Sequence, residues 1–300
     1  MQRFKTVCGD VSECDLGVTL PHEHICCYSE HFYKMGGKAY LDKELLTRTS
    51  IRYLKELKQK HGLSGFIDCT PVNIGRDIEL LKRVSYESGV NIIASTGFYY
   101  TRDPLLFKDP DCIAQYLSAD AERVNAAIIK AAVEYEEISP FDKNLLKAYA
   151  IAQKNLGLPI ILHTNARNKN ALPALEFLLS GGVSPSAITV GHLSDTEELD
   201  YISEIARLGC YIGLDRLYGH VTEEYISKKI DCIRSLCDKG YADKILLSHD
   251  ALFFNGFDKV PGINEKPRFA YVFENILPRL DKNIAEKITI KNPQKMLSGE

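Results

Sequence analysis

The segment Gly17-Val18-Thr19-Leu20-Pro21-His22-Glu23-His24 begins with a short apolar run and ends in three polar residues. The apolar run recurs seven more times, at residues 65–68, 91–94, 126–129, 159–162, 187–190, 211–214 and 244–247. Short continuous apolar runs are typical of strands that are covered on both faces of a parallel sheet. Longer segments between them, such as residues 43–60, 141–156 and 196–208, carry apolar residues at helical spacing with charged residues on the other side. We therefore expect eight buried strands that alternate with helices.

Eight strand–helix units determine the expected fold class. Distributed over 300 residues, they give about 37 residues per unit, which is the size expected for a (β/α)8 barrel. The competing fold, a doubly wound open sheet, usually has a glycine-rich phosphate-binding turn after its first strand, and this chain has no GxGxxG or P-loop pattern. We predict an α/β protein that forms one (β/α)8 TIM barrel domain over residues 1–300.

The overall composition is that of an ordinary globular protein. Hydrophobic residues make up 45% of the chain and charged residues 26%, which excludes a disordered, collagen-like or coiled-coil protein. The formal net charge of -3 gives no reason to expect nucleic acid or an anionic membrane as a partner. No apolar run reaches the roughly 18 residues of a membrane span. We expect a small-molecule substrate, no nucleic acid, no membrane, and leave a homodimer open.

The location is expected from the first residues and the cysteines. The start Met1-Gln2-Arg3-Phe4-Lys5-Thr6 has no apolar segment typical of a signal peptide. The nine cysteines include no CxxC pair and no zinc-finger spacing. We therefore expect a cytoplasmic protein with reduced thiols.

Polar residues follow the predicted strands directly, at the rim where a (β/α)8 barrel builds its active site. Five of the eight histidines lie there, namely His22, His24, His163, His192 and His249. Because His22 and His24 are two residues apart, an extended strand places both imidazoles on one face and Glu23 on the other. Asp250 follows the last strand and reaches the same rim. Imidazole and carboxylate groups suit a divalent ion such as zinc, so we predict a metal site.

Lys130 is a charged residue in an apolar environment, between Ile128-Ile129 and Ala131-Ala132. A buried ammonium group is costly unless it is paired or changes its protonation state. One interpretation is a lysine that reaches solvent or pairs with a carboxylate. We prefer the other interpretation, in which Lys130 reaches the barrel mouth in a neutral or modified form and takes part in the site.

Together these motifs resemble the phosphotriesterase family of the amidohydrolase superfamily, which includes metal-dependent lactonases. The resemblance covers the chain from about residue 7 almost to its end. The matching motifs are residues 17–24, Ile128-Ile129-Lys130, Leu162-His163-Thr164, Val190-Gly191-His192, Ile212-Gly213-Leu214-Asp215-Arg216, Leu247-Ser248-His249-Asp250 and Asn292-Pro293.

The resemblance implies two divalent metal ions, with zinc preferred and manganese or cobalt as alternatives, bridged by a hydroxide. His22, His24 and Asp250 would hold the buried ion, and His163 and His192 the more exposed one. Lys130 would react with carbon dioxide to give a carbamate that bridges both ions. Asp250 would also accept the proton of the attacking hydroxide. Some relatives use glutamate in place of the lysine, and here Glu134, Glu136 and Glu137 are nearby but lie beyond the strand.

The substrate depends on residues around the metal site. In the lactonase branch of the family a tyrosine after strand three and an arginine after strand seven face the substrate, and Tyr99 and Arg216 occupy those places here. Both can donate hydrogen bonds to a developing oxyanion. Arg268 and Tyr271 would lie on one face of a helix beginning at Pro267 and could bind a substrate phosphate.

These observations favour a binuclear metal-dependent lactonase, with phosphorylated sugar lactones as one substrate class. The alternatives on the same metal site are a phosphotriesterase, which hydrolyses organophosphates, and an N-acyl amidohydrolase. The absence of tryptophan weakly disfavours the triester. A metal-stabilised binding or sensor protein that has lost catalysis is a further alternative. The loss of a metal-ligand position would have favoured it, but this sequence has a suitable residue at every ligand position of the family pattern.

Overall fold

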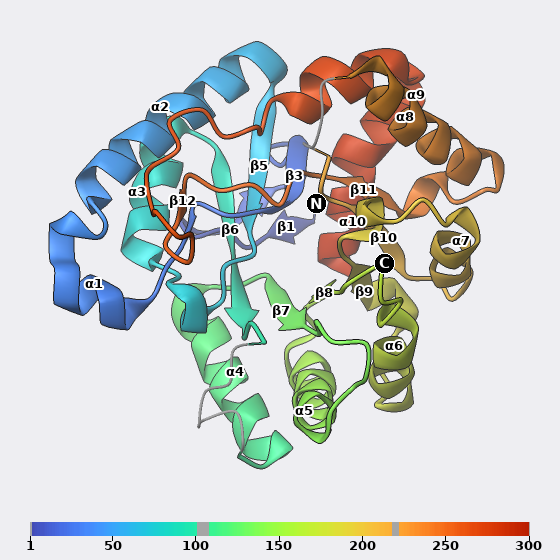
Figure 1. Ribbon diagram of the computed structural model, residues 1–300, viewed down its shortest axis with the longest axis horizontal. Coiled ribbons are helices and arrows are strands. Elements are labelled where there is room, and N and C mark those ends of the chain that lie inside the picture. The colour runs from blue at the N-terminus through green and yellow to red at the C-terminus, as the bar shows by residue number, and fades with distance from the viewer. Residues whose placement is uncertain (1, 101–107, 218–221, 300) are drawn as a thin grey trace.

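Eight parallel strands form the central sheet of the protein, which we describe from a computed structural model covering residues 2–100, 108–217 and 222–299. In spatial order the strands are β3 (Val18–Glu23), β5 (Leu63–Asp68), β6 (Asn91–Gly97), β7 (Ile128–Ala132), β8 (Ile160–His163), β9 (Ile188–Val190), β10 (Tyr211–Leu214) and β11 (Ile245–Leu247). Each strand is hydrogen-bonded in parallel to the next one in this order, and the sheet curves into a nearly closed barrel (Figure 1). The predicted (β/α)8 barrel is confirmed.

The barrel closes between its first and last strands, β3 and β11. The backbone N–H of Asp250 donates to the carbonyl of His22 at 3.1 Å, and the N–H of His22 donates to the Ser248 hydroxyl at 3.0 Å. The closure therefore lies beside the histidines of the predicted metal site.

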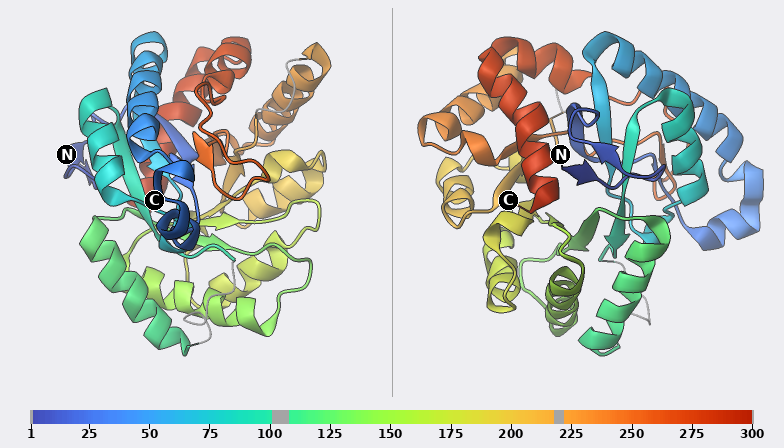
Figure 2. Two further views of the ribbon diagram at one scale, coloured as in Figure 1. Left: turned by 60° about the vertical axis from the view of Figure 1, so that its left-hand side comes forward. Right: turned by 180° about the vertical axis from the view of Figure 1, so that it is seen from behind.

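Helices follow the strands and cover the outside of the barrel (Figure 2). They are α2 (Lys43–His61), α3 (Ile78–Ser88), α4 (Pro110–Val124), α5 (Pro140–Leu156), α6 (Ala171–Ser180), α7 (Leu199–Arg207) and α8 (Glu223–Asp238), with α9 (Lys282–Glu286) and α10 (Asn292–Ser298) after the last strand. The helices predicted over residues 43–60, 141–156 and 196–208 correspond to α2, α5 and α7. Their ends have local causes, since Asp42 caps the first turn of α2 and Gly62 ends it with a φ of 71°.

Short elements complete the described chain. The antiparallel pair β1 (Arg3–Phe4) and β2 (Val11–Ser12) lies on the side of the barrel seen from behind in Figure 2. On the opposite side, β4 (Cys26–Cys27) pairs with β12 (Phe254–Asn255), and α1 (Glu30–Gly36) lies nearby (Figure 1). Single 3-10 or π turns lie at residues 37–39, 72–74, 185–187, 193–195, 242–244, 272–276, 277–279 and 287–291. No helix in the described ranges has the length and apolar character that crossing a membrane requires.

The strands place alternate residues inside and outside the barrel, as the two-residue period of a strand dictates. Ile93 and Ile161 belong to a small apolar cluster inside the barrel, whereas their neighbours Ile92 and Ile160 belong to the larger cluster under the helices. Both clusters are closed to solvent. The inner cluster supports the polar rim above it.

This alternation places Lys130 inside the barrel. The strand predicted at 126–129 is shifted by two residues, so that Lys130 is the middle residue of β7 rather than the residue after it. Ile128 belongs to the inner cluster, and Lys130, two residues later, points the same way. The Lys130 side chain therefore lies at the centre of the barrel.

A β-bulge in β3 directs His22 inward. Leu20 pairs with Phe66 and Glu23 pairs with Asp68, so three steps along β3 oppose two steps along β5. Such an extra residue reverses the alternation of side chains and is often found next to active sites. Since Leu20 belongs to the outer cluster, an unbulged strand would have directed His22 outward as well.

Candidate metal centre

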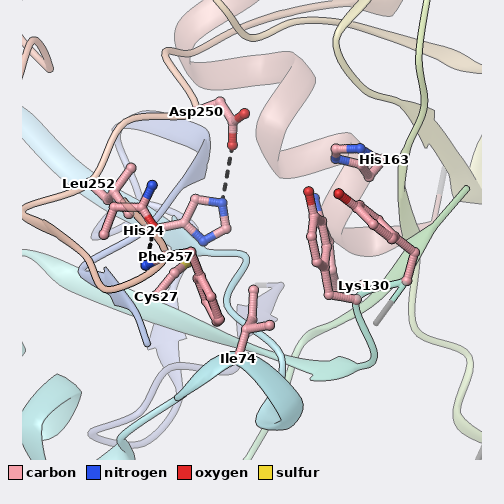
Figure 3. A pocket seen from close by; sticks show the side chains of 11 residues that line it. His24, Cys27, Ile74, Lys130, His163, Asp250, Leu252 and Phe257 are labelled. Atoms are coloured by element: carbon pink, nitrogen blue, oxygen red, sulfur yellow. Dashed lines mark hydrogen bonds and ion pairs between the residues drawn. The ribbon is translucent and has the colours of Figure 1, made fainter. Parts of the chain in front are cut away.

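Six predicted site residues meet at the carboxyl end of the strands. His22 and Lys130 lie within β3 and β7, His24 and His192 follow β3 and β9, His163 ends β8, and Asp250 follows β11. Figure 3 shows four of them, His24, Lys130, His163 and Asp250, around one cavity. The histidines and the lysine are buried, and Asp250 is partly exposed.

Two groups of ligand atoms face the centre of this rim. In the first group, His24 Nε2 lies 3.1 Å from Asp250 Oδ1, and His22 Nε2 lies 3.7 Å from the same oxygen. Lys130 Nζ adjoins this group, 2.7 Å from His22 Nε2. In the second group, His163 Nδ1 and His192 Nε2 lie 2.7 Å apart. The first group of three ligand atoms is compact enough to hold a metal ion.

Each of these four imidazoles also binds an oxygen with its other nitrogen. The pairs are His22 Nδ1 with Asp215 at 2.5 Å, His192 Nδ1 with Asp215 at 2.9 Å, His163 Nε2 with Glu134 at 2.8 Å, and His24 Nδ1 with Thr70 at 2.8 Å. Metal-binding histidines typically donate their second N–H to such an oxygen, which leaves a lone pair for the metal. When His163 and His192 each carry their proton on the outward nitrogen, their inward nitrogens have only lone pairs and face each other. A cation between them would bind both lone pairs and remove this repulsion. The donor set therefore fits divalent ions.

The backbone of two of these residues is strained. His192 and Asp250 have φ values of 64° and 52°, in the left-handed region that residues other than glycine rarely adopt. Such a conformation costs on the order of 1–3 kcal/mol and persists where the surrounding structure enforces it. Strain at two adjacent rim positions agrees with a functional site.

Glu23 explains how the segment carrying Asp250 is held. Its fully buried carboxylate accepts hydrogen bonds from the Ser248 hydroxyl, from the His249 backbone and imidazole, and from the Ala251 N–H, at 2.6–3.0 Å. His249, the fifth rim histidine, thus contributes to the structure and not to the metal centre, because its Nδ1 binds Glu23 and its Nε2 accepts from the Val272 N–H.

Lys130 has neither of the two ordinary environments of a buried lysine. Its side chain is 1% exposed, so the amine does not reach solvent. Among the described residues no carboxylate lies within 4.0 Å of Nζ, and its hydrogen-bonding neighbour is His22 Nε2. Of the nearby glutamates, Glu134 binds the outer nitrogen of His163, and Glu136 and Glu137 are exposed. The unmodified amine therefore has no anionic partner here.

The burial of the site keeps two of the imidazoles neutral. Burial lowers the pKa of His163 to about 4 and that of His192 to about 3. Burial opposes ionisation of Asp215, but His192 and His22 hold its pKa well below its usual range. Likewise His192 and His24 outweigh burial and lower the pKa of Asp250. For His163 and His192, neutral imidazoles beside ionised carboxylates are the protonation states that metal binding requires.

We expect the metal-free protein to lose stability as the pH falls from 6.5 to 4.5. His163 and His192 have folded pKa values below the 6.5 of an unfolded histidine, so the unfolded chain binds more protons in this range and acid favours unfolding. His24, whose pKa Cys27 and Asp250 raise to about 10 against burial, stays protonated in the folded protein and opposes this slope above about pH 5.5, where the unfolded histidine still titrates, but it is one group against two. Urea unfolding of chelator-treated protein measures this. A urea midpoint at pH 4.5 that is no lower than the midpoint at pH 6.5 would contradict the expectation. His163→Gln removes one of the two titrating groups and should make the pH dependence of the midpoint shallower.

Arg216 and Tyr99, the predicted substrate-facing residues, both adjoin the metal centre. Arg216 Nε donates to Asp250 Oδ2 at 2.9 Å, and its Nη1 donates to Asp195 at 2.8 Å. The ring of Tyr99 lies edge-on to His163, with 5.1 Å between ring centroids. The backbone of Tyr99 is held by two hydrogen bonds to the side chain of Asn73.

Two cavities flank the centre. The larger, of about 390 Å³, is mostly apolar. It is lined by the four site residues in Figure 3 and by Cys27, Ile74, Tyr99, Tyr100, Leu252, Asn255 and Phe257. The smaller, of about 260 Å³, is polar and is lined by Glu134, Thr164, Asn165, Arg167, Asp195 and Arg216. The site thus has an apolar side and a polar side.

Arg268 and Tyr271 line neither of these two cavities. The prediction that a helix begins at Pro267 is wrong, because residues 265–270 form bends and a turn and the next regular element is a π turn at Val272–Ile276. Arg268 is exposed and Tyr271 is buried. The carbonyl of Arg268 accepts the backbone N–H of Tyr271 at 3.0 Å.

The motifs alone did not reveal the role of the residues that orient the predicted ligands, namely Glu23, Thr70, Glu134 and Asp215. Asp215 could have been found, since it follows the seventh apolar run at the same rim. Glu23 could have been found as the charged residue between two ligands. Nothing in the spacing of Thr70 indicates its role.

The chain is similar over almost its whole length to proteins that are already known. The sequence profile described as "Phosphotriesterase family" matches residues 2–297. An aryldialkylphosphatase of Saccharolobus solfataricus is 33% identical, with 95% of this chain and 96% of that protein covered. A phosphotriesterase homology protein of Mycobacterium tuberculosis is 28% identical over 94% of this chain and 92% of its own length. The human N-acetyltaurine hydrolase is 27% identical over 99% of this chain and 98% of its own length.

Proposed function

The chain belongs to the phosphotriesterase family, and from this premise we propose that it is a binuclear metal-dependent hydrolase that acts on lactones. The observation that carries the proposal is the set of four buried imidazoles, each with one nitrogen bound outward to an oxygen and one nitrogen directed to the centre. The coarser statement within this proposal, that the chain is a hydrolase with residues that could bind metal, agrees with its family and with the relatives described above.

We assign His22, His24 and Asp250 to one ion and His163 and His192 to the other, with zinc as the preferred metal. Lys130 lies beside His22 and would bridge both ions as a carbamate formed with carbon dioxide. That modification replaces a buried cation that lacks a carboxylate partner with an anion that has two ligand oxygens. When bound, the two ions would polarise the substrate carbonyl and make water acidic enough to react at neutral pH.

Asp250 is positioned to accept the proton of the attacking water. One of its oxygens faces His24, and the other accepts the N–H of Arg216. Arg216 is cationic under all relevant conditions and stabilises the ionised carboxylate, so Asp250 releases the proton readily to the leaving oxygen. The edge of the Tyr99 ring adjoins His163 and places its hydroxyl-bearing side chain on the cavity wall.

The larger cavity supports a lactone with an apolar substituent. Ile74, Leu252 and Phe257 would cover such a substituent, while the polar side with Arg216 would adjoin the ring oxygens. Binding of a substrate phosphate by Arg268 and Tyr271 stays a prediction, as do the cytoplasmic location and the dimer.

Two alternatives each find support among the relatives. The aryldialkylphosphatase supports a phosphotriester as substrate, and the N-acetyltaurine hydrolase supports an N-acyl amide. The metal ligands are compatible with all three reactions, so the substrate must be decided by the cavity walls.

Metal analysis and a substrate panel test the proposal. Protein produced with zinc or manganese should contain about two ions per chain, as two-metal hydrolases do. Its kcat/KM should be highest for an alkyl-substituted lactone, compared with a phosphorylated sugar lactone, a paraoxon-like triester and an N-acyl amide. Fewer than one ion per chain would contradict the metal site. A preference for the phosphorylated lactone that Arg268→Ala removes would support the phosphate role instead.

A further inference from the structure

We propose that Asp215 is a positioning residue that selects the tautomer of one ligand in each metal group and thereby couples the two groups. This inference rests on the metal assignment of the proposed function. It concerns a buried carboxylate that touches neither cavity and that the reaction itself does not use.

Three donors converge on this one carboxylate. Asp215 Oδ1 accepts the His192 backbone N–H at 2.7 Å and lies 2.9 Å from His192 Nδ1. Asp215 Oδ2 lies 2.5 Å from His22 Nδ1. His22 and His192 belong to different ligand groups, and their Nε2 atoms face Lys130 and His163 respectively. A carboxylate cannot donate, so both rings must carry their proton on Nδ1 and keep the Nε2 lone pair free.

Asp215, His22 and His192 could in principle hold an ion themselves, because their three ligand atoms are sufficiently close together. The backbone N–H of His192 argues against this. An amide N–H can only donate, and its 2.7 Å contact with Oδ1 identifies that oxygen as a hydrogen-bond acceptor. The 2.9 Å distance from Oδ1 to His192 Nδ1 is also that of a hydrogen bond to a charged group.

Two glycines provide the space for this carboxylate. A Cβ atom added to Gly191 would lie 3.0 Å from Asp215 Oδ2 and 3.4 Å from the His22 ring, and one added to Gly213 would lie 3.0 Å from the same oxygen. Gly191 follows β9 and directly precedes His192, and Gly213 lies in the neighbouring strand β10, two residues before Asp215. The recess is therefore shaped for the carboxylate and for the ring it orients.

An amide at position 215 would remove one of the two acceptor oxygens that His192 and His22 use. Asparagine keeps one acceptor oxygen, and the two donors of His192 would retain it. The amide NH₂ group would then face His22 Nδ1, which must become an acceptor and move its proton to Nε2. His22 would lose the lone pair directed at the ion it shares with His24 and Asp250.

The test compares Asp215→Asn with Glu134→Gln, a matched carboxylate-to-amide change beside the single ligand His163. Glutamine can still accept from His163 with its oxygen, and the side-chain amide of Asn165, which donates to the other Glu134 oxygen at 3.1 Å, can turn to accept from the new NH₂ group. Glu134→Gln should therefore retain two ions per chain. Asp215→Asn should retain about one, and the affinity for the second ion should fall at least about 10-fold, as is usual when such a partner of a ligand is lost. Loss of one or both ions only in Asp215→Asn supports the coupling. Equal retention of both ions in the two variants would overturn it.

A second measurement uses the unaltered protein, in case Asp215→Asn does not fold. In chelator-treated protein, ¹⁵N NMR should show the proton of His22 and of His192 on Nδ1. A proton on Nε2 of either ring would overturn the inference. If the metal-loaded protein instead contained fewer than one ion per chain, the proposed function would fail while the tautomer result remained readable.

Discussion

Lys130→Ala should abolish hydrolysis and lower the metal content of the protein. The substitution removes the group that we assign as the bridging anion, and the alanine leaves both ligand groups without the oxygen ligands that they share. Lys130 lies at the centre of the barrel, and no described carboxylate lies within 4.0 Å of its Nζ to take its place. The measurements are kcat/KM and metal equivalents per chain.

Chemical rescue separates loss of the bridge from loss of the fold. A short carboxylic acid such as propionate fits the space left by the lysine and supplies two oxygens, so it should restore part of both the activity and the metal content. Lys130→Glu, which provides a covalent carboxylate, should retain more activity than Lys130→Ala. Full activity of Lys130→Ala without added acid would show that the lysine is not the bridge.

The sequence predicted the barrel well because its signals are local. A buried parallel strand is a short apolar run and an amphipathic helix has its own period, so β5, β6, β8 and α2 could be located without tertiary information. The residues that we assign as ligands could be picked out in the same way, since the carboxyl ends of eight parallel strands must meet at one rim.

The orientation of side chains at that rim was less predictable. His249 follows its strand at a position where a ligand could stand, yet its imidazole binds the carboxylate of Glu23 and does not face the centre. The inward direction of His22 depends on the bulge in β3, which Pro21 alone does not reveal. Asp215 gains its role only when the carboxyl ends of β9, β10 and β3 meet at one rim, although β11 separates β10 from β3 around the barrel. These features arise from contacts between distant segments, which a single sequence does not show.

Asp250→Asn should reduce kcat by about 100- to 10,000-fold, the range expected for loss of a general base. Asparagine resembles aspartate in shape but cannot accept the proton at neutral pH. It also has one acceptor oxygen, whereas Asp250 uses one oxygen toward His24 and the other for the N–H of Arg216. The single amide oxygen can therefore either face the metal ion or accept the N–H of Arg216, but not both. We expect kcat to fall more than the metal content does.

Asp195→Asn is the matched control, because Asp195 is the other carboxylate bound to Arg216. This change removes the same charge from the same arginine but leaves the proton acceptor and the ion ligands in place. Its kcat should fall by less than about 10-fold, the effect of roughly 1.4 kcal/mol, since Arg216 keeps its hydrogen bond to Asp250. If Asp195→Asn lost as much activity as Asp250→Asn, the essential role of Asp250 would be to hold Arg216. A kcat of Asp250→Asn within about 10-fold of the unaltered protein would show that another group accepts the proton.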